Sequence, residues 1–485
     1  MQFPQSCSRF SGLQNPARIK GPVIITADKS ERLRINGGRL SRENLQKVIE
    51  IAKCSKARFL HLTTREAIQL HDVEPTRIEA VIDLCLQLGL PFRGGGGDTF
   101  RNILTSPLGG LRKESVFDVY PYAEELKKYI FSVESAFHLP RKIKIAMFDA
   151  PQDERFVRVQ DLGFLAVKKD GMKGFRVWGG GGIGRNSAEG VLLLDFIPVA
   201  KAAAAAKAMI DLFSEHGNRK NRAMARIRYI VKALGAEEFK KLYLSYFEKA
   251  DAPDLKPEFG KSHERLLPKS FSAHLNPGLD TWKRLNTRPS TKPEESLVHI
   301  RIPHGTLRAK DLEAFHWIME KYSLAELRLT PARDFYFVDF PTDALPALYD
   351  DLLKLLPKLD TTLKSFAGQI VTCIGCTVCK IGIRNSPELG DRIGAALDAF
   401  FDGKEEEKIR LADQIIDKIR ISGCPSCCTT HPMADIGMNG LIRNGTPCWQ
   451  FYTKENPDQI LGTPETEPTG DDEAVSKIMA RLGLC

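Results

Sequence analysis

The chain contains an internal repeat, and this repeat restricts its architecture more than any other feature. Arg32–Leu90 and His299–Pro357 align at a constant offset of 267 positions, without gaps through their first forty residues. Apolar residues fall on apolar residues, as Leu33 does on Ile300. Two segments that share one apolar pattern are expected to fold alike, so the sequence predicts two similar units related by a pseudo-two-fold axis.

Each copy of the repeat is predicted to be an α+β unit. An alternating strand comes first, and a helix follows whose apolar residues recur at three- and four-residue spacing from Leu45 to Ala52. A second strand comes next, which we expect over Phe59–Leu62 in the first copy and over Phe335–Phe340 in the second. A second helix then closes each unit.

The segment after the first unit is rich in glycine, with runs at Gly94–Gly97 and Gly179–Gly184. Glycine lets a backbone approach a flat or anionic ligand closely, although plain turns explain such runs equally well. The segment from Ala250 to Glu295 is rich in proline and polar residues. It is predicted to be a long connection between the two halves.

The segment after the second unit is rich in cysteine, because seven of the eleven cysteines lie between Cys373 and Cys448. In a cytosolic protein such a group is more typical of metal binding than of disulfides. Two C-x2-C pairs would suit zinc, a C-x2-C-x2-C run occurs in bacterial ferredoxins, and C-x5-C with C-x3-C is a third possibility. The two C-x2-C pairs are Cys376/Cys379 and Cys424/Cys427. The C-x2-C-x2-C run is Cys373, Cys376 and Cys379. The C-x5-C and C-x3-C set is Cys373, Cys379, Cys424 and Cys428. Spacing alone leaves all three open.

Composition restricts the class of protein and its partners. The 485 residues are 42% hydrophobic and 27% charged, with a formal net charge of +9. Their number predicts two or three domains. No apolar run is long enough to span a bilayer, and Met1–Gly21 lacks a signal-peptide core, so we expect a cytoplasmic protein without a membrane partner. The basic residues are dispersed, which argues against nucleic acid and leaves a small anion or an acidic protein as partner.

The residues around the last cysteines resemble those of the sirohaem-dependent sulfite and nitrite reductases. The resemblance rests on Gly423-Cys-Pro with Cys428, on the following Ala434-Asp-Ile-Gly437, and on further segments along nearly the whole chain. The family uses C-x5-C and C-x3-C as ligands, which implies a 4Fe–4S cluster held by Cys373, Cys379, Cys424 and Cys428. It also implies that Cys428 ligates the sirohaem iron, with Cys376 and Cys427 as additional thiols.

The resemblance also implies a cage of cationic and polar side chains around the substrate and the sirohaem. Substrate-binding cations are implied at Arg32, Arg101, Lys142 and Lys144. Contacts to the sirohaem are implied at Thr64, Arg65, Gln69, His71, Arg219 and Arg222. Arginine holds oxyanions in a planar fork, whereas lysine can deliver protons, which the removal of oxygen as water consumes. On a strand, Lys142 and Lys144 would point to one face.

The implied fold is α+β, with two ferredoxin-like half-domains and two sirohaem- and iron–sulfur-binding α+β domains. The first half-domain with the N-terminal segment would occupy residues 1–90, and the first sirohaem-binding domain residues 91–249. A linker is expected over residues 250–295, the second half-domain over 296–357, and the 4Fe–4S/sirohaem-binding domain over 358–485.

The implied activity is the six-electron reduction of sulfite to sulfide. Within the family a Lys-x-Lys pair goes with sulfite and Lys-x-Asn with nitrite, so Lys142-Ile-Lys144 favours sulfite and leaves nitrite reduction as the alternative. More distant alternatives are a precorrin-3B synthase-like enzyme, an iron–sulfur electron carrier and a zinc-stabilised binding module. The chain has no convincing P-loop or dinucleotide fingerprint, so electrons are expected from an external ferredoxin or flavoprotein.

Overall fold

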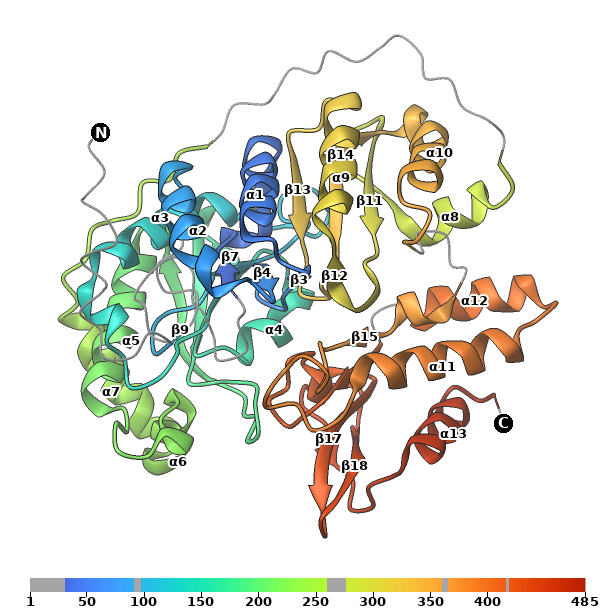
Figure 1. The fold of residues 1–485 in the computed structure, drawn as a ribbon. Helices are drawn as coiled ribbons and strands as arrows, with labels where there is room; N and C mark the ends of the chain where they lie inside the picture. The colour runs from blue at the N-terminus through green and yellow to red at the C-terminus, as the bar shows by residue number, and fades with distance from the viewer. Residues whose placement is uncertain (1–30, 91–96, 260–275, 360–364, 416–417, 485) are drawn as a thin grey trace.

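A computed structural model describes residues 31–90, 97–259, 276–359, 365–415 and 418–484. In these ranges the chain forms four β-sheets, one of four strands and three of five, with helices packed around them (Figure 1). The predicted α+β class and the internal repeat are confirmed.

The two copies of the repeat match element for element. The first consists of β1 (Glu31–Leu33), β2 (Arg39–Ser41), α1 (Arg42–Ser55), β3 (Phe59–Leu62), β4 (Ile68–His71) and α2 (Ile78–Gln87). The second consists of β11 (Glu295–Ile300), β12 (Thr306–Leu307), α9 (Ala309–Lys321), β13 (Glu326–Leu329), β14 (Phe335–Pro341) and α10 (Leu345–Leu355). The counterpart of β3 is therefore β13, and the prediction that placed Phe335–Phe340 there was wrong. That segment is β14, the counterpart of β4. Only the constant offset of the repeat, and not the apolar composition of the two strands, shows that β13 and not β14 corresponds to β3.

The first helix of each copy starts at a defined polar contact. The Ser41 side chain accepts a hydrogen bond from the Asn44 N–H (3.1 Å) at the start of α1. At the start of α9 the Asp311 carboxylate accepts one from the Arg308 N–H (2.7 Å). The predicted apolar face of α1, which runs from Leu45 to Ala52, is buried.

Each copy completes its sheet with a strand from the other copy. β12 pairs antiparallel with β3, and β2 pairs antiparallel with β13. The buried apolar residues of both copies form one continuous core. Because the strands are exchanged and the core is shared, the two half-domains form a single folding unit.

The repeat continues into two further five-stranded sheets. The first contains β5 (Leu104–Thr105), β6 (Ile145–Phe148), β7 (Leu162–Lys169), β8 (Met172–Gly179) and β9 (Val191–Pro198). The second contains β15 (Val371–Thr372), β16 (Ile419–Ser422), β17 (Ile436–Arg443), β18 (Thr446–Thr453) and β19 (Thr463–Pro464). In both sheets the first three strands run parallel to one another. The fourth strand pairs antiparallel with the third, and the fifth pairs antiparallel with the fourth. The offset is 267 between β5 and β15, 274 for the next three pairs of strands and 272 between β9 and β19.

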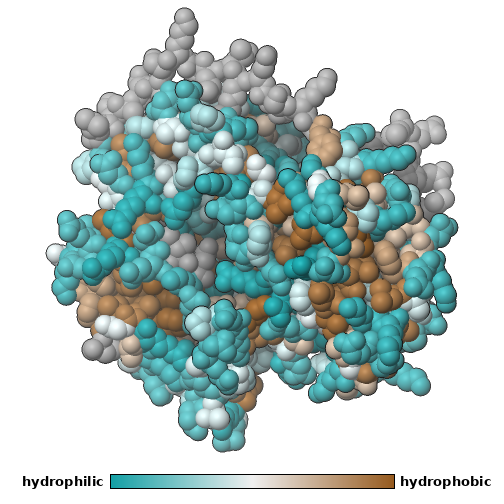
Figure 2. Space-filling view, turned by 180° about the vertical axis from the view of Figure 1, so that it is seen from behind, coloured by the Kyte–Doolittle hydropathy of each residue, from teal (hydrophilic) through white to brown (hydrophobic). Residues whose placement is uncertain are grey.

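Each of these sheets has its own core and its own helices (Figure 1). The helices after β5 are α3 (Tyr120–Ser132), α4 (Glu154–Arg158), α5 (Ala202–His216), α6 (Ile227–Leu234) and α7 (Ala236–Glu248). Those after β15 are α11 (Ser386–Phe400), α12 (Glu405–Ile415) and α13 (Asp471–Arg481). No described helix combines the length and the apolar character needed to cross a membrane. The face seen in Figure 2 is largely hydrophilic, with apolar side chains in separate patches.

The segment predicted as a linker over residues 250–295 contains regular structure at its C-terminal end. There α8 (Leu279–Asn286) leads into β10 (Thr287–Pro289), which pairs with β11. Trp282 of α8 is fully buried in the core of the half-domains. The extent of the linker was therefore wrong, because its proline and polar residues obscured one short amphipathic helix.

Candidate cofactor and anion site

The predicted cluster cysteines follow two neighbouring strands of the second five-stranded sheet. β15 and β16 are parallel, with Thr372 opposite Ile421, so their carboxyl ends place Cys373 and Cys424 at the same edge. The Cys373 N–H donates to the Ile421 carbonyl (3.0 Å), and the Cys373 sulfur accepts a hydrogen bond from the Gly423 N–H (3.0 Å).

The structure gathers the four cysteines of the C-x5-C and C-x3-C set. Burial raises the pKa of the Cys428 thiol, and the neighbouring thiolates of Cys373, Cys424 and Cys379 raise it further. Cys428 is nevertheless exposed, so it has close protein neighbours and one open side. No group of three or more His, Cys, Asp or Glu side chains in the described ranges is arranged to hold a single metal ion. A 4Fe–4S cluster needs no such group, because each thiolate binds a different iron.

The two additional cysteines differ from each other. Cys427 is buried, and its sulfur lies 3.3 Å from the Gly184 carbonyl oxygen and 3.6 Å from Nε2 of His431. Cys376 is exposed, and its backbone N–H donates to the Arg384 carbonyl (3.1 Å). Cys427 is thus a packed thiol.

The predicted lysine pair precedes β6 in the first five-stranded sheet. Ile143 between the two lysines is buried and forms a parallel bridge with Phe100, so the flanking Lys142 and Lys144 side chains leave the other face. Burial and nearby cations, Arg226 first, together lower the pKa of Lys144 to about 7. Burial, with the charges of Arg101 and Lys144, lowers the pKa of Lys142 well below its ordinary value.

The lysine pair and the last cysteine meet across the two halves of the chain. The Cys428 thiolate acts on the pKa of Lys144 by raising it, and Lys142 acts on the pKa of Cys428 by lowering it. These effects place the Cys428 sulfur near the lysine pair, and the Cys427 sulfur lies 3.3 Å from the Gly184 carbonyl oxygen of the first half. The first half therefore supplies the cations, and the second half supplies the thiol.

The other predicted cage residues take different positions. Arg101 is buried and donates to the Gly97 carbonyl (2.8 Å), beside Lys142. Arg32 stands opposite Gln69 in the pairing of β1 with β4. Thr64 is half-buried in the turn between β3 and β4.

Two predicted sirohaem contacts are engaged with protein groups. Arg65 donates to Oε1 of Gln160 (2.9 Å) and to the Ile145 carbonyl (2.7 Å), so it ties this turn to β6. His71 is buried at the end of β4 and stacks on Phe59, with ring centroids 4.8 Å apart.

Arg219 and Arg222 were predicted as contacts of the sirohaem, whereas the nearby Arg226 and Arg228 were not. Arg219 is exposed and donates to the Ser214 carbonyl (3.1 Å), and Arg222 is exposed and pairs with Asp98 (2.5 Å). Arg226 is the residue that approaches Lys144, and it is held by Asp161 through two hydrogen bonds (3.1 and 2.7 Å).

The missed arginines carried a usable sequence signal. Arg226-Ile-Arg228 repeats the pattern of Lys142-Ile-Lys144, in which two cations flank a buried isoleucine. Arg228 is buried, and its Nε and Nη1 atoms have no hydrogen-bond partner among the described residues.

The second glycine run makes room for these arginines. A Cβ atom on Gly182 would lie 2.9 Å from Nη1 of Arg228 and 3.2 Å from Nη2 of Arg226. A Cβ atom on Gly184 would lie 3.2 Å from Nη2 of Arg228. The close approach that glycine permits is therefore to two guanidinium groups. Most of the first run, Gly94–Gly97, lies outside the described residues.

The pseudo-equivalent position in the first half carries no thiol. By the repeat, Ser106 stands where Cys373 stands, and its hydroxyl accepts a hydrogen bond from the Asp149 N–H (3.0 Å), as the Cys373 sulfur does from Gly423. Arg112 occupies the place of Cys379 and forms ion pairs with Asp149 (2.8 Å) and Asp153. One half thus has an ion-pair network where the other has its cysteines.

Two family profiles match the sequence. "Nitrite/Sulfite reductase ferredoxin-like half domain" matches residues 28–88 and 289–355, the two copies of the repeat. "Nitrite and sulphite reductase 4Fe-4S domain" matches residues 96–250, which span the first of the paired five-stranded sheets. Residues 96–250 contain no cysteine, so the thiols lie in the structural counterpart of the matched domain.

Known proteins resemble the chain over most of its length. The "Assimilatory ferredoxin-dependent nitrite reductase" of Haloferax mediterranei is 26% identical over 396 residues, which are 79% of this chain and 64% of that protein. The "Sulfite reductase [NADPH] hemoprotein beta-component 2" of Klebsiella pneumoniae is 24% identical over 477 residues, 88% of this chain and 78% of that protein. The solved Mycobacterium tuberculosis NirA protein shares the fold, with a TM-score of 0.74 at 22% identity over 93% of this chain and 79% of that one.

Proposed function

Because the chain belongs to the nitrite and sulfite reductase family, we propose that it reduces sulfite to sulfide at a sirohaem that shares Cys428 with a 4Fe–4S cluster. The observation that carries this proposal is the meeting of Lys142 and Lys144 from one half with Cys428 from the other. A thiol and two desolvated ammonium groups suit a centre that delivers electrons and protons to one anion.

The side chains present fit both cofactors of the family. Four thiols are gathered for the cluster: Cys373, Cys379, Cys424 and Cys428. The buried Nε and Nη1 atoms of Arg228 have no partner in the described ranges, and buried donors without acceptors are costly. A macrocycle with several carboxylates would supply acceptors for such donors, and the surrounding cations would balance its charge.

The chain's own groups divide the chemistry between binding and proton delivery. When bound, the coupled sirohaem and cluster supply electrons to the oxyanion. A pKa of about 7 leaves Lys144 able to give up a proton and regain it near neutral pH. Arg101 remains a fixed cation that holds the anion and the charge that develops on it. Asp161 accepts the Lys144 backbone N–H (2.8 Å) and binds Arg226, so it positions both.

Nitrite reduction is the second candidate. The Lys142-Ile-Lys144 pair favours sulfite, whereas the name of the Haloferax relative favours nitrite. Anaerobic turnover with a reduced dye, with each anion in turn, separates the two. We expect faster turnover of sulfite in the native protein, and a shift toward nitrite in Lys144→Asn. The exposed Lys168→Asn serves as the control. A native protein that strongly prefers nitrite would refute the sulfite assignment.

The cofactor assignment has its own test. The purified native protein should show a Soret-type band and a broad charge-transfer band. Cys428→Ser should lose the coupled spectrum, whereas Cys376→Ser, at an exposed thiol, should keep it. A colourless zinc protein would refute the assignment, and so would iron–sulfur absorption without a macrocycle. An enzyme like precorrin-3B synthase or a simple electron carrier would fail to turn over either anion.

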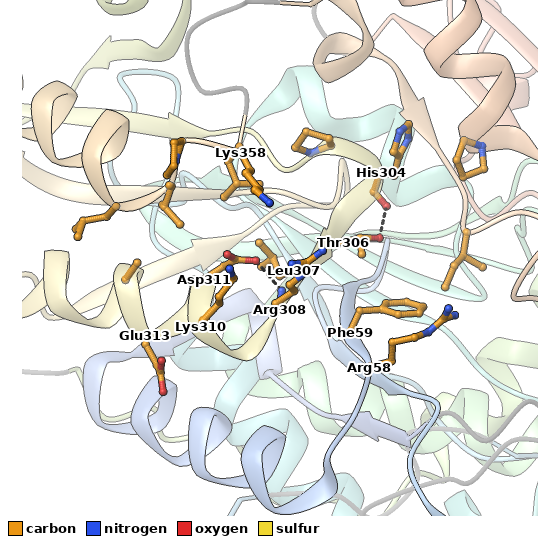
Figure 3. A pocket seen from close by; sticks show the side chains of 18 of the residues that line it. Arg58, Phe59, His304, Thr306, Leu307, Arg308, Lys310, Asp311, Glu313 and Lys358 are labelled. Carbon is orange, nitrogen blue, oxygen red and sulfur yellow. Dashed lines mark hydrogen bonds between the residues drawn. The ribbon is translucent and has the colours of Figure 1, made fainter.

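Electrons are proposed to come from an acidic ferredoxin or a flavoprotein docked beside the cluster. A groove of about 1150 Å³ runs along α9 (Figure 3). Ile374, Thr377 and Val378 of the cysteine loop form part of its wall. Basic side chains line it: Arg58, Arg308, Lys310, Lys354 and Lys358. Asp311 and Glu313 are the acidic residues of that lining. A basic groove next to the cluster loop suits an acidic donor.

Charge reversal tests this docking site. Lys310→Glu with Lys358→Glu should raise the KM for reduced ferredoxin at least tenfold at low salt and leave turnover with the small dye unchanged. The exposed Lys168→Glu, on the first five-stranded sheet, is the matched control. The native rate with ferredoxin should fall as salt is added, because salt screens exposed charges. An unchanged KM in the double variant would place the donor elsewhere.

A further inference from the structure

A buried arginine lies beside the strand that leads into the cysteine loop. Arg333, in the turn between β13 and β14, is 2% exposed and has a φ of +73°. Its backbone N–H donates to the Thr330 carbonyl (3.0 Å), which closes the turn. Gly305 packs on it so tightly that a Cβ atom there would lie 2.8 Å from the Cβ of Arg333. The side chain is therefore fixed by the packing around its base.

The repeat shows which strand Arg333 faces. Its counterpart in the first half is Glu66, also buried at positive φ, whose carboxylate accepts the Thr105 N–H (3.3 Å) at the end of β5. The counterpart of Thr105 is Thr372, directly before Cys373. Equivalent turns therefore direct an ionisable side chain at equivalent strands, but of opposite type: a carboxyl group in the half without thiols and a guanidinium in the half with them.

Arg333 forms no ion pair with a carboxylate of the described residues. Its Nε and Nη1 atoms are buried without a hydrogen-bond partner among the described residues. The adjacent Asp334 is instead bound to His299, with 2.6 Å between Oδ2 and Nε2. Burial lowers the pKa of Arg333, the nearby sulfurs of Cys373 and Cys428 oppose that fall, and the resulting pKa is about 10. The guanidinium therefore stays charged at neutral pH, close to two of the four cysteines.

We propose that Arg333 is a fixed cation of the cluster environment, with its free N–H groups turned toward the cluster sulfurs, and that it raises the reduction potential of the cluster. Reduction adds one electron, taken from the external donor, and no proton is needed. A positive charge held nearby in a low-dielectric interior favours the form that carries the additional negative charge. Hydrogen bonds to cluster sulfurs act in the same direction. The proposal rests on the proposed function, because it assumes that the four cysteines hold a cluster.

A redox titration followed by electron paramagnetic resonance tests the proposal on the holoprotein. Arg333→Gln should lower the midpoint potential of the cluster by at least 59 mV, a tenfold change in the one-electron equilibrium constant. Arg333→Lys keeps the charge and should change that constant less than threefold. Arg328→Gln is the matched control, because Arg328 is also buried (4% exposed) but is bound to Glu326 (2.8 Å). It should leave the potential unchanged.

The outcomes are distinguishable. If Arg333→Gln assembles the cluster and changes the equilibrium constant less than twofold, the proposal is wrong. If Arg333→Gln does not assemble the cluster, the midpoint potential of Arg333→Lys decides the question. A tenfold change of the one-electron equilibrium constant in Arg333→Lys would show that the positive charge does not set the potential. A native protein without any cluster signal would instead refute the proposed function. Thermal melting of each apoprotein separates loss of fold from a change in potential.

Discussion

Asp161 is the buried carboxylate on which the lysine and arginine side of the site depends, and Asp161→Asn tests this dependence. Asp161 is fully buried directly before β7. Its Oδ2 accepts the backbone N–H of Lys144 (2.8 Å) and Nη2 of Arg226 (2.7 Å), and its Oδ1 accepts Nε of Arg226 (3.1 Å). The variant keeps the shape of the side chain but removes its charge, so Arg226 loses its counterion.

The size of the effect follows from the burial of both partners. Removing one member of a buried ion pair costs about 3–5 kcal/mol, because the other charge stays desolvated without compensation. Asparagine keeps one oxygen acceptor, so we expect the lower end, about 3 kcal/mol. Since 1.36 kcal/mol corresponds to a factor of ten, the amides of β6 and β7 should open roughly 100-fold more often. Hydrogen exchange of the apoprotein measures this locally, without a global unfolding transition.

An exposed ion pair provides the control. Asp195 pairs with Arg176 at 2.9 Å, but its carboxylate side chain is 70% exposed. Exposed pairs contribute about 0–1 kcal/mol, so Asp195→Asn should leave exchange nearly unchanged. If Asp161→Asn exchanges in β6 and β7 within threefold of the native protein, Asp161 does not hold this side of the site together.

Three further measurements follow from other parts of the structure. Nitrite keeps its charge near neutral pH, so its affinity should rise as the pH falls through about 7, where Lys144 gains its proton. In a binding titration, Lys144→Arg should flatten this pH profile of nitrite affinity. An unaltered profile would show that Lys144 does not belong to the anion site. Burial raises the pKa of Glu66 well above 4.5, so the folded chain keeps a proton that the unfolded chain releases, and stability falls as the pH rises above 4.5. Glu66→Gln should therefore raise the melting temperature at pH 7 more than at pH 4, and equal shifts would contradict this assignment. A Cβ atom on Gly437 would lie 1.9 Å from the His431 carbonyl oxygen, so Gly437→Ala should lower the free energy of unfolding by about 1–3 kcal/mol in chemical denaturation. Gly470→Ala is the control and should lower it much less, because nothing lies within 4 Å of its Cβ position. Equal losses would show that the contact at Gly437 is relieved without strain.

The sequence was sufficient for the ferredoxin-like repeat but not for its extension. Through α1 and α9 the two copies keep one offset, and a single apolar pattern identifies both. Between β5 and β6 the offset changes by seven residues relative to β15 and β16, so no ungapped alignment follows the second pair of sheets. The sequence also could not predict that β2 and β12 are exchanged between the two copies. Each of these strands has only two or three residues and pairs with a partner far away in the sequence.

The candidate site was predicted from the family resemblance, because spacing alone left three sets of cysteines open. The residues that it singled out share a local setting: Cys373 and Cys424 follow adjacent strands, and Lys142 and Lys144 flank a buried isoleucine. Arg226-Ile-Arg228 repeats the spacing of the lysine pair, but the position of Arg226 beside Lys144 depends on Asp161, directly before β7, which no local pattern connects to it. The replacement of the Glu66 carboxyl group by the Arg333 guanidinium likewise emerges only when the two turns are superposed by the repeat.

The division of the site between the two halves also sets the time at which it can be completed during synthesis. Lys144 and Cys428 are 284 positions apart in the chain. At about 5–20 residues per second, the basic side is made roughly 15–60 s before the last thiol leaves the ribosome. Throughout that interval the nascent chain presents cations without the complete set of four cysteines, so it can attract anions but cannot hold the cluster. Insertion of the metal centre must therefore be among the last events in the maturation of this protein.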